Sequence, residues 1–175
     1  IAPFKGGTNF NFLQFYGDWL FYRLSSTTAI RYNTVTGQLD SVHVQQPNYL
    51  TPVDVDKVWM RQGIGSTVLV SFKTKEIVPV NNTRFDEAFT DNNFFITAAF
   101  AGQGSELFTI IQDKGYFRYN PVTNRFKRIN FFNDGKLLTG KPLLTRNNFF
   151  KEKNGTVWFT NEEGLFFLNP LTASI

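Results

Sequence analysis

The sequence predicts an all-β protein, a β-propeller of about four blades in which each blade is a four-stranded antiparallel sheet. Three observations lead to this prediction. Short alternating strands rich in Phe, Tyr and Trp run through the 175 residues. Turns that contain Gly, Asn or Pro separate these strands, and one order of strands and turns recurs along the chain. A β-sandwich in which the turns coincide by chance is the alternative all-β architecture.

The clearest copy of the recurring unit lies near the C-terminus, at residues 154–172. An Asn-Gly turn opens the alternating strand 156–160, and a second turn that ends at Gly164 opens the strand 165–168. The turn 169–172 follows, in which an Asn starts the bend and a Pro fixes φ. This order predicts a β-hairpin followed by a tight reversal.

Further copies occupy residues 104–126 and 17–39, and a weak copy occupies 66–77. In each copy an aromatic or aliphatic residue comes shortly before the last turn. These residues are separated by 40, 47 and 49 positions, and they are Tyr32, Phe72, Tyr119 and Leu168. A period of roughly 40–50 residues that holds four short strands is typical of a propeller blade.

We therefore expect one partial propeller over residues 1–175, with blades at about 10–50, 51–86, 92–135 and 145–175. The expected innermost strands are 11–16, 55–62, 94–100 and 148–151, and the expected outermost strands include 38–44 and 125–132. The sequence QQPNYLTP at 45–52 is expected to form a loop, because turn-forming residues dominate it. The polar segment 81–93 is expected to be a long loop or one helical turn.

The two best copies resemble the two-component regulator propeller repeat, whose pattern is roughly G-x-L-W-x-G-T, then G-L-x-x-Y-D/N-P-x-T. The matching residues include Gly155, Trp158 and Gly164, followed by Asn169 and Pro170. Thr160 and Asn161 stand where the family has Gly-Thr, and the copy at 104–126 has Phe108 in place of the Trp. The Phe- and Asn-rich composition also resembles that of Bacteroidetes proteins.

This resemblance implies a periplasmic or cell-surface location and a sensor region of a hybrid two-component system. Such regions often detect glycan fragments, and a histidine kinase belongs elsewhere in such a protein. Rings of this family close with about seven blades, so four blades form part of a larger ring. We expect the remaining blades to come from further chain or from a second copy of this one, because an open arc exposes sheet faces.

Composition excludes several kinds of site. The chain has no cysteine, so no disulfide framework or thiolate metal site is present. Its one histidine, His43, rules out a multi-histidine zinc site and is expected to be solvated on an outer strand. No apolar run is long enough to span a membrane as a helix. We expect no metal and no cofactor.

The net charge is +4, and basic residues concentrate between positions 113 and 153. Arg125, Lys127 and Arg128 share an outer strand with Phe126. Edge protection by solvated cations is the favoured interpretation of this strand. Binding of an anionic polysaccharide or lipopolysaccharide is the alternative, and nucleic acid is not an expected partner.

No arrangement of a nucleophile and a base is visible, so this segment is not expected to be an enzyme. Asp54 and Asp56 alternate onto one face of an expected strand, which is compatible with a glycosidase pair. A solvated face or a contact to Ca²⁺ is the favoured interpretation of these two carboxylates. No phosphate-binding loop or dinucleotide fingerprint occurs.

Propeller ligands usually meet the loops that link one blade's outer strand to the next blade's inner strand, which here are 45–54, 86–93 and 137–147. Arg can pair with an acidic sugar, Asn can bond hydroxyls, and an aromatic ring can stack on a sugar. The predicted ligand-binding residues are Asn48, Tyr49, Trp59, Arg61, Arg146 and Asn147.

The predicted function is a non-catalytic ligand-sensing propeller that recognises a glycan or oligosaccharide. The alternative is a cell-surface structural or docking propeller that binds protein or lipopolysaccharide.

Overall fold

The protein is all-β in its computed structural model, as the sequence predicts. The structure describes residues 13–63, 66–87, 89, 94–101, 106–130, 132–133, 136–137, 149–152, 156–161 and 164–168. Within these residues the helical structure is limited to one 3₁₀ turn, η1 (Asn82–Arg84). The chain forms two compact units, Ile1–Val80 and Asn81–Ile175, which are described one at a time.

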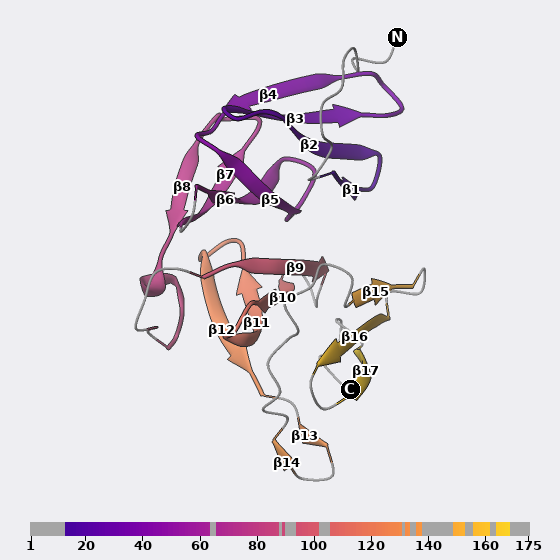
Figure 1. Cartoon of the computed structure of the whole chain (residues 1–175), viewed down its shortest axis with the longest axis vertical. Helices are drawn as coiled ribbons and strands as arrows, with labels where there is room; N and C mark the ends of the chain where they lie inside the picture. The colour runs from indigo at the N-terminus through magenta and orange to yellow at the C-terminus, as the bar shows by residue number, and fades with distance from the viewer. Residues whose placement is uncertain are drawn as a thin grey trace. The chain divides into compact units, whose positions relative to one another are not determined.

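The first unit contains two four-stranded antiparallel sheets, and in both the strands follow one another in chain order (Figure 1). The first sheet consists of β1 (Gln14–Tyr16), β2 (Trp19–Ser25), β3 (Thr28–Asn33) and β4 (Leu39–His43). The second sheet consists of β5 (Pro47–Pro52), β6 (Lys57–Gln62), β7 (Ser66–Ser71) and β8 (Ile77–Val80).

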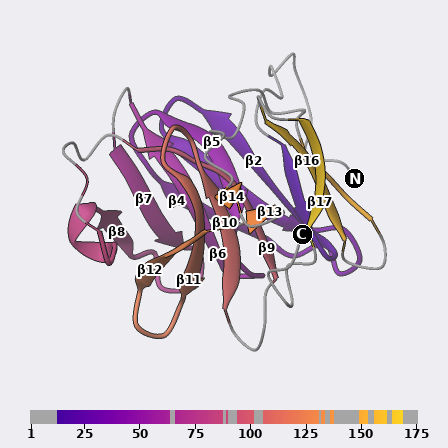
Figure 2. The ribbon, with the colours of Figure 1, turned by 90° about the horizontal axis from the view of Figure 1, so that it is seen from below.

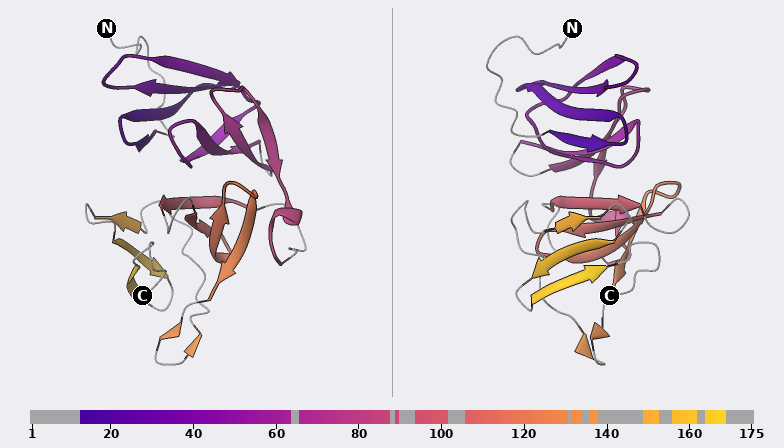
Figure 3. Two further views of the ribbon diagram at one scale, coloured as in Figure 1. Left: turned by 180° about the vertical axis from the view of Figure 1, so that it is seen from behind. Right: turned by 90° about the vertical axis from the view of Figure 1, so that its right-hand side faces the viewer.

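The second unit contains the third four-stranded sheet of the chain, and its last sheet shows part of the same pattern. The third sheet consists of β9 (Ile96–Ala101), β10 (Leu107–Ile111), β11 (Gly115–Asn120) and β12 (Arg125–Ile129), which lie side by side in Figure 2. A small hairpin joins β13 (Phe132–Asn133) to β14 (Lys136–Leu137). The last sheet consists of β15 (Phe149–Lys151), β16 (Val157–Asn161) and β17 (Gly164–Leu168), drawn in gold and yellow in Figure 3.

Most predicted strands are confirmed, and two predictions in the second sheet are wrong. Segment 45–52, predicted as a loop, contains strand β5. Segment 55–62, predicted as the first strand of its blade, contains a turn followed by β6, the second strand of the sheet. Proline explains the error, because Pro47 and Pro52 are the two end residues of an edge strand, where no ladder hydrogen bond has to be donated.

One turn geometry recurs between the third and fourth strands of the first three sheets. The side-chain oxygen of Asn33 accepts from the backbone N–H of Thr36 at 2.8 Å, and that of Asn120 accepts from Thr123 at 3.1 Å. The Ser71 hydroxyl oxygen accepts from Thr74 N–H, also at 3.1 Å. Four positions after each of these residues the backbone is left-handed, with φ of 75°, 63° and 52° at Gly37, Lys75 and Asn124.

This recurrence gives the sequence repeat a physical meaning. Asn and Ser side chains start a turn by accepting from the backbone two or three residues further on. In the first and third sheets the residue before the turn starter is the aromatic residue that the repeat aligns: Tyr32, which precedes Asn33, and Tyr119, which precedes Asn120. In the second sheet the aligned Phe72 follows Ser71 by one residue, so that copy is offset.

The core of the first unit lies between its two sheets. Alternate residues of β2 and β3, such as Phe21 and Ala29, contact alternate residues of β6 and β7, such as Met60 and Val70. The rings of Phe21 and Phe72 meet edge to face, with centroids 5.7 Å apart. Burial of each large apolar side chain stabilises the fold by about 1.5–3 kcal/mol, so this interface holds the two sheets together.

In the second unit, the segment after η1 packs against the outer strand of the third sheet. Phe85 is 3 % exposed and forms a parallel bridge with Phe126 of β12, with ring centroids 4.5 Å apart. Its ring also meets Phe89 at 4.4 Å, Phe94 at 4.8 Å and Phe117 at 5.3 Å. The helical-turn prediction for 81–93 therefore holds for η1, while the phenylalanines of this segment belong to the core.

The basic residues of β12 are paired with carboxylates of the segment that covers it. Arg128 Nε lies 2.7 Å from a Glu87 oxygen, and Arg125 Nη2 lies 3.7 Å from an Asp86 oxygen. The Arg125 guanidinium also donates to the backbone carbonyl of Thr83. Lys127 is exposed. These pairs, together with the bridge at Phe85, favour edge protection over an anionic polysaccharide surface on this strand.

Candidate functional site

The structure places four of the six predicted ligand-binding residues on two neighbouring strands. Asn48 and Tyr49 lie in β5, whereas Trp59 and Arg61 lie in β6. Arg146 and Asn147 lie outside the described residues. Trp59 is 1 % exposed, so its ring is part of the packed interior. The remaining three residues are half-buried and form the centre of the candidate site.

Strand β5 is irregular at this point. Asn48 is paired with Arg61 and Thr51 with Trp59, so the register shifts by one residue between them. Tyr49, inside this bulge, has a left-handed φ of 49°, and Gln46 just before the strand has a φ of 44°. A left-handed aromatic residue costs conformational energy, and bulges of this kind often redirect side chains beside functional sites.

The side chain of Asn48 is held by an arginine from the first sheet. Arg23 Nη1 lies 2.7 Å from Asn48 Oδ1. A guanidinium only donates hydrogen bonds, so this contact fixes the carbonyl oxygen of the amide toward Arg23. Within the part of the chain that the structure describes, this contact with Arg23 is the side-chain hydrogen bond that Asn48 makes.

Backbone hydrogen bonds fix this end of the two sheets. Gln46 N–H donates to Ser26 O in the β2–β3 turn at 2.7 Å, and Gly63 N–H in the β6–β7 turn donates to Gln46 O at 3.2 Å. Gly63 has a left-handed φ of 59°. The segment that connects β4 to β5 is therefore tied to two hairpin turns, and the site is built on a fixed backbone rather than on a long loop.

Arg23 is a residue that sequence reasoning missed. It lies on β2, 25 positions before Asn48, and nothing in its local pattern separates it from other strand arginines. Only the packing of the first sheet against β5 brings it to the site. The candidate site therefore consists of Arg23, Asn48, Tyr49 and Arg61, which we call the β5 site.

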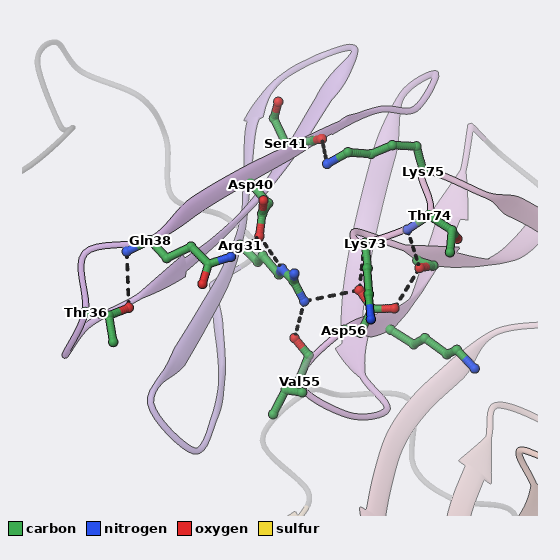
Figure 4. Close-up of polar contacts among 12 residues, drawn as sticks. Arg31, Thr36, Gln38, Asp40, Ser41, Val55, Asp56, Lys73, Thr74 and Lys75 are labelled. Atoms are coloured by element: carbon green, nitrogen blue, oxygen red, sulfur yellow. Dashed lines mark hydrogen bonds and ion pairs between the residues drawn. The ribbon is translucent and has the colours of Figure 1, made fainter.

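A second polar cluster surrounds Arg31 and has a structural role (Figure 4). Arg31 Nε lies 2.8 Å from Asp40 on the adjacent strand, while Nη1 lies 3.1 Å from Asp56 and donates to Val55 O at 2.7 Å. Its guanidinium also lies 4.5 Å from the centroid of the Trp19 ring. Arg31 therefore links the first sheet to the β5–β6 turn.

The carboxylates of Asp54 and Asp56 are not arranged as a glycosidase pair. They lie in the turn before β6 and not on a strand, which corrects the prediction that they share a strand face. Asp54 accepts from the backbone N–H groups of Asp56 and Lys57, each at 2.7 Å. Asp56 accepts from Ser71 Oγ and Lys73 N–H, each at 2.6 Å. These bonds, with the Arg31 pair, account for both carboxylates as parts of the fold.

Other chemical groups in the described part of the chain offer no metal centre. No cluster of three or more His, Asp or Glu residues suited to a metal ion occurs among those residues. His43, the sole histidine, is exposed on β4, as predicted. None of the described helical structure is long and apolar enough to cross a membrane.

Comparisons with known proteins identify fold relatives. No protein-family model and no curated protein matches the chain. The chain is similar in structure to the extracellular domain of a protein described as a hybrid two component system from B. thetaiotaomicron. The identity is 14 %, the match covers 95 % of this chain and 22 % of that one, and the TM-score is 0.57.

Dihydro-heme d1 dehydrogenase NirN is also similar, at 9 % identity over 90 % of this chain and 33 % of that one, with a TM-score of 0.51. The chain therefore spans about a fifth and a third of the length of these two solved chains. At such low identities the likeness concerns the fold.

Proposed function

We propose that this chain is a partial β-propeller of the two-component regulator repeat type and serves as an extracytoplasmic, non-catalytic sensing module for a glycan or oligosaccharide. Its blades are the four sheets, at about 10–50, 51–86, 92–135 and 145–175. The observation that carries the proposal is the recurring four-stranded sheet with its Asx- or Ser-started turn. The fold likeness to the extracellular domain of a described hybrid two component system supports it.

The β5 site supports the binding part of this proposal. It lies where the outer strand of one sheet connects to the first strand of the next, which is the region where propeller ligands usually bind. It combines a fixed backbone with amide, guanidinium and phenol groups on half-buried side chains. Such a mixture of donors beside an aromatic ring suits a hydroxyl-rich sugar.

Binding to a panel of oligosaccharides by isothermal titration calorimetry tests the proposal. We expect one class of oligosaccharide to bind with a Kd in the micromolar to millimolar range, and Asn48→Ala to weaken that binding at least tenfold. Lys127→Gln, on the outer strand of another sheet, is the matched control and should leave the Kd unchanged. Unchanged affinity in Asn48→Ala would remove the β5 site from the proposal, and no binding to any oligosaccharide would contradict glycan sensing.

A docking function on the cell surface is the second candidate, and one observation favours it. Leu165 and Phe167 on β17 are 65 % and 51 % exposed, and alternate residues of a strand point to one face. Exposed apolar patches often mark contacts with other proteins. Further propeller blades or a second copy of the chain are the partners that this face suits. Light scattering that gives a monomer mass of 20.1 kDa would contradict self-association.

A further inference from the structure

The last sheet carries an inference about a partner, which rests on the second candidate function, the docking role, and is independent of glycan sensing. We propose that the outer edge of β17, the side away from β16, pairs with β17 of a second copy of the chain. The two strands run antiparallel about a two-fold axis at Phe166, so that Leu165 of each copy lies opposite Phe167 of the other. The last sheets of the two copies then form one continuous sheet.

The first step concerns the backbone of β17. Among the strands that the structure describes, β16 alone pairs with it, and a two-residue loop closes this hairpin between Asn161 and Gly164. The closing pair of such a hairpin is hydrogen-bonded, and hydrogen-bonded and non-hydrogen-bonded pairs alternate along the ladder. Leu165 and Phe167 are therefore in non-hydrogen-bonded pairs with β16. Their backbone N–H and C=O groups point to the outer edge, where an added strand can bond to them.

The second step concerns the side chains of the same two residues. Leu165 and Phe167 are 65 % and 51 % exposed on one face of the strand. The repeat aligns Leu168 with Tyr119, so Leu165 corresponds to Tyr116 of the third sheet, which is 5 % exposed. The same position of the unit is thus covered in the third sheet and open in the last one, which indicates that β17 accepts a further contact.

Contacts within the last sheet fix this apolar face before any partner arrives. The ring of Phe167 meets that of Trp158 on the neighbouring strand, with centroids 5.5 Å apart. The indole N–H of Trp158 donates to Glu152 Oε1 at 2.8 Å. A surface whose side chains are already held loses little conformational entropy on association.

The outer strands of the other three sheets are protected, each in its own way. On β4, Lys75 Nζ donates to the backbone carbonyl of Ser41 at 2.8 Å. Strand β8 contains Pro79, which has no N–H to offer. Strand β12 is covered by the parallel bridge between Phe85 and Phe126 and carries three cations. Strand β17 has the sequence GLFFL, without a charge or a proline, so it lacks the residues that usually prevent strand addition.

A second copy suits this edge because the strand is complementary to itself. Two uncharged strands meet without like-charge repulsion, and an axis at Phe166 uses both outward-facing residues of each copy in two hydrogen-bonded pairs. Each pair also places a leucine beside a phenylalanine on one face, which is a favourable cross-strand combination. An axis at Leu165 instead places Phe167 opposite the hairpin turn, so that register is poorer.

The small size of the contact sets the expected affinity. An interface built on one strand of five residues is smaller than the roughly 1,200 Å² buried in stable complexes. We therefore expect a weak dimer whose population rises with concentration. Sedimentation of the unmodified chain from micromolar to millimolar concentration should show the mass rise from 20.1 kDa toward twice that value.

A matched pair of lysine variants locates the contact. Leu165→Lys places a cation on the edge, and we expect it to weaken dimerisation at least tenfold. Val122→Lys is the control, because Val122 is 81 % exposed in the turn between β11 and β12 and the substitution adds the same charge. This variant should dimerise as the unmodified chain does.

A cross-link tests the register. The chain has no cysteine, so Phe166→Cys introduces a single thiol at the proposed axis. Opposed residues of a non-hydrogen-bonded pair are the closest in an antiparallel ladder, so oxidation should link the two copies by a disulfide. Val122→Cys, which lies away from the edge, should give far less of the linked dimer.

The outcomes separate this inference from the docking role on which it rests. A monomer mass at every concentration would overturn both, and that measurement needs no variant. A dimer that is equally stable in Leu165→Lys and Val122→Lys would overturn the β17 edge and leave self-association through another surface. Loss of the dimer in Leu165→Lys without a cross-link in Phe166→Cys would overturn the pairing of β17 with itself, because another segment of the second copy would then occupy the edge.

Discussion

Arg31 of the first sheet and Asp56 of the β5–β6 turn are joined by an ion pair of 3.1 Å, which links the first sheet to the second. The Arg31 side chain is 8 % exposed, and it forms a second ion pair with Asp40 on the adjacent strand. A pair that is partly shielded from water contributes little net energy when intact but costs much when one partner is removed. This asymmetry makes Arg31 a sensitive point of the first unit.

The first prediction concerns Arg31→Ala. It leaves two carboxylates without their cation, and we expect the free energy of unfolding to fall by about 2–4 kcal/mol. Chemical denaturation measures this change. Lys75→Ala is the control, because Lys75 Nζ also links the two sheets, through Ser41 O at 2.8 Å, but is exposed. Its cost should stay below about 1 kcal/mol, and equal costs for both variants would contradict the role given to Arg31.

The second prediction concerns the recurring turn. Asn33→Ala removes the oxygen that accepts from Val35 and Thr36, and we expect a loss of about 1–2 kcal/mol in the free energy of unfolding. Asn33→Asp keeps the acceptor and should lose less than half of that. Thermal unfolding of both variants measures the difference. If the two variants melted together, the side-chain oxygen would have no stabilising role.

The third prediction concerns Phe85. Truncation to Ala opens a cavity among four aromatic rings, so we expect a loss of about 3–5 kcal/mol. Phe85→Leu, which keeps more of the volume, should cost less. Hydrogen exchange provides a second measurement, because the N–H of Asp86 donates to Phe126 O at 3.0 Å only while the segment stays in place. Unchanged exchange at Asp86 in the Ala variant would show that another contact holds the segment.

The fourth prediction concerns the charge on β12. Glu87→Gln removes the carboxylate that lies 2.7 Å from Arg128, and we expect the protein to elute from a heparin column at a higher salt concentration. Glu76→Gln changes the net charge equally at an exposed position in the first unit and serves as the control. Identical elution of the two variants would mean that net charge alone, rather than the uncovered arginine, sets the retention.

The fifth prediction concerns pH. Burial raises the pKa of the Tyr22 phenol above its usual value, and neighbouring Tyr32 adds a smaller effect. The folded protein therefore holds this proton more tightly than the unfolded chain does. The free energy of unfolding should fall as the pH rises above about 10, where the unfolded tyrosine begins to ionise. Tyr22→Phe should reduce this slope in denaturation measured at several pH values, and an unchanged slope would assign the effect to other groups.

The sequence was sufficient for the class and for most strands, because alternation, glycine turns and the repeated aromatic position are local features. Strand β5 was missed for a local reason as well, since its two end prolines are typical of a loop and only its pairing with β6 reveals the strand. Two features of the candidate β5 site are non-local. Arg23 contacts Asn48 because the first sheet packs against β5. The left-handed backbone of Tyr49 belongs to a bulge that no pattern of residues predicts.

The recurring turn keeps one backbone geometry although its residues differ from copy to copy. Its left-handed position is occupied by a glycine, a lysine and an asparagine in three successive copies, and its first position by Asn, Ser and Asn. The backbone geometry of the turn is the same in the three copies, although the residues that form it differ. One fold can thus be built from copies whose sequences no longer agree, which is consistent with a chain that no family model matches but whose fold resembles that of a solved structure.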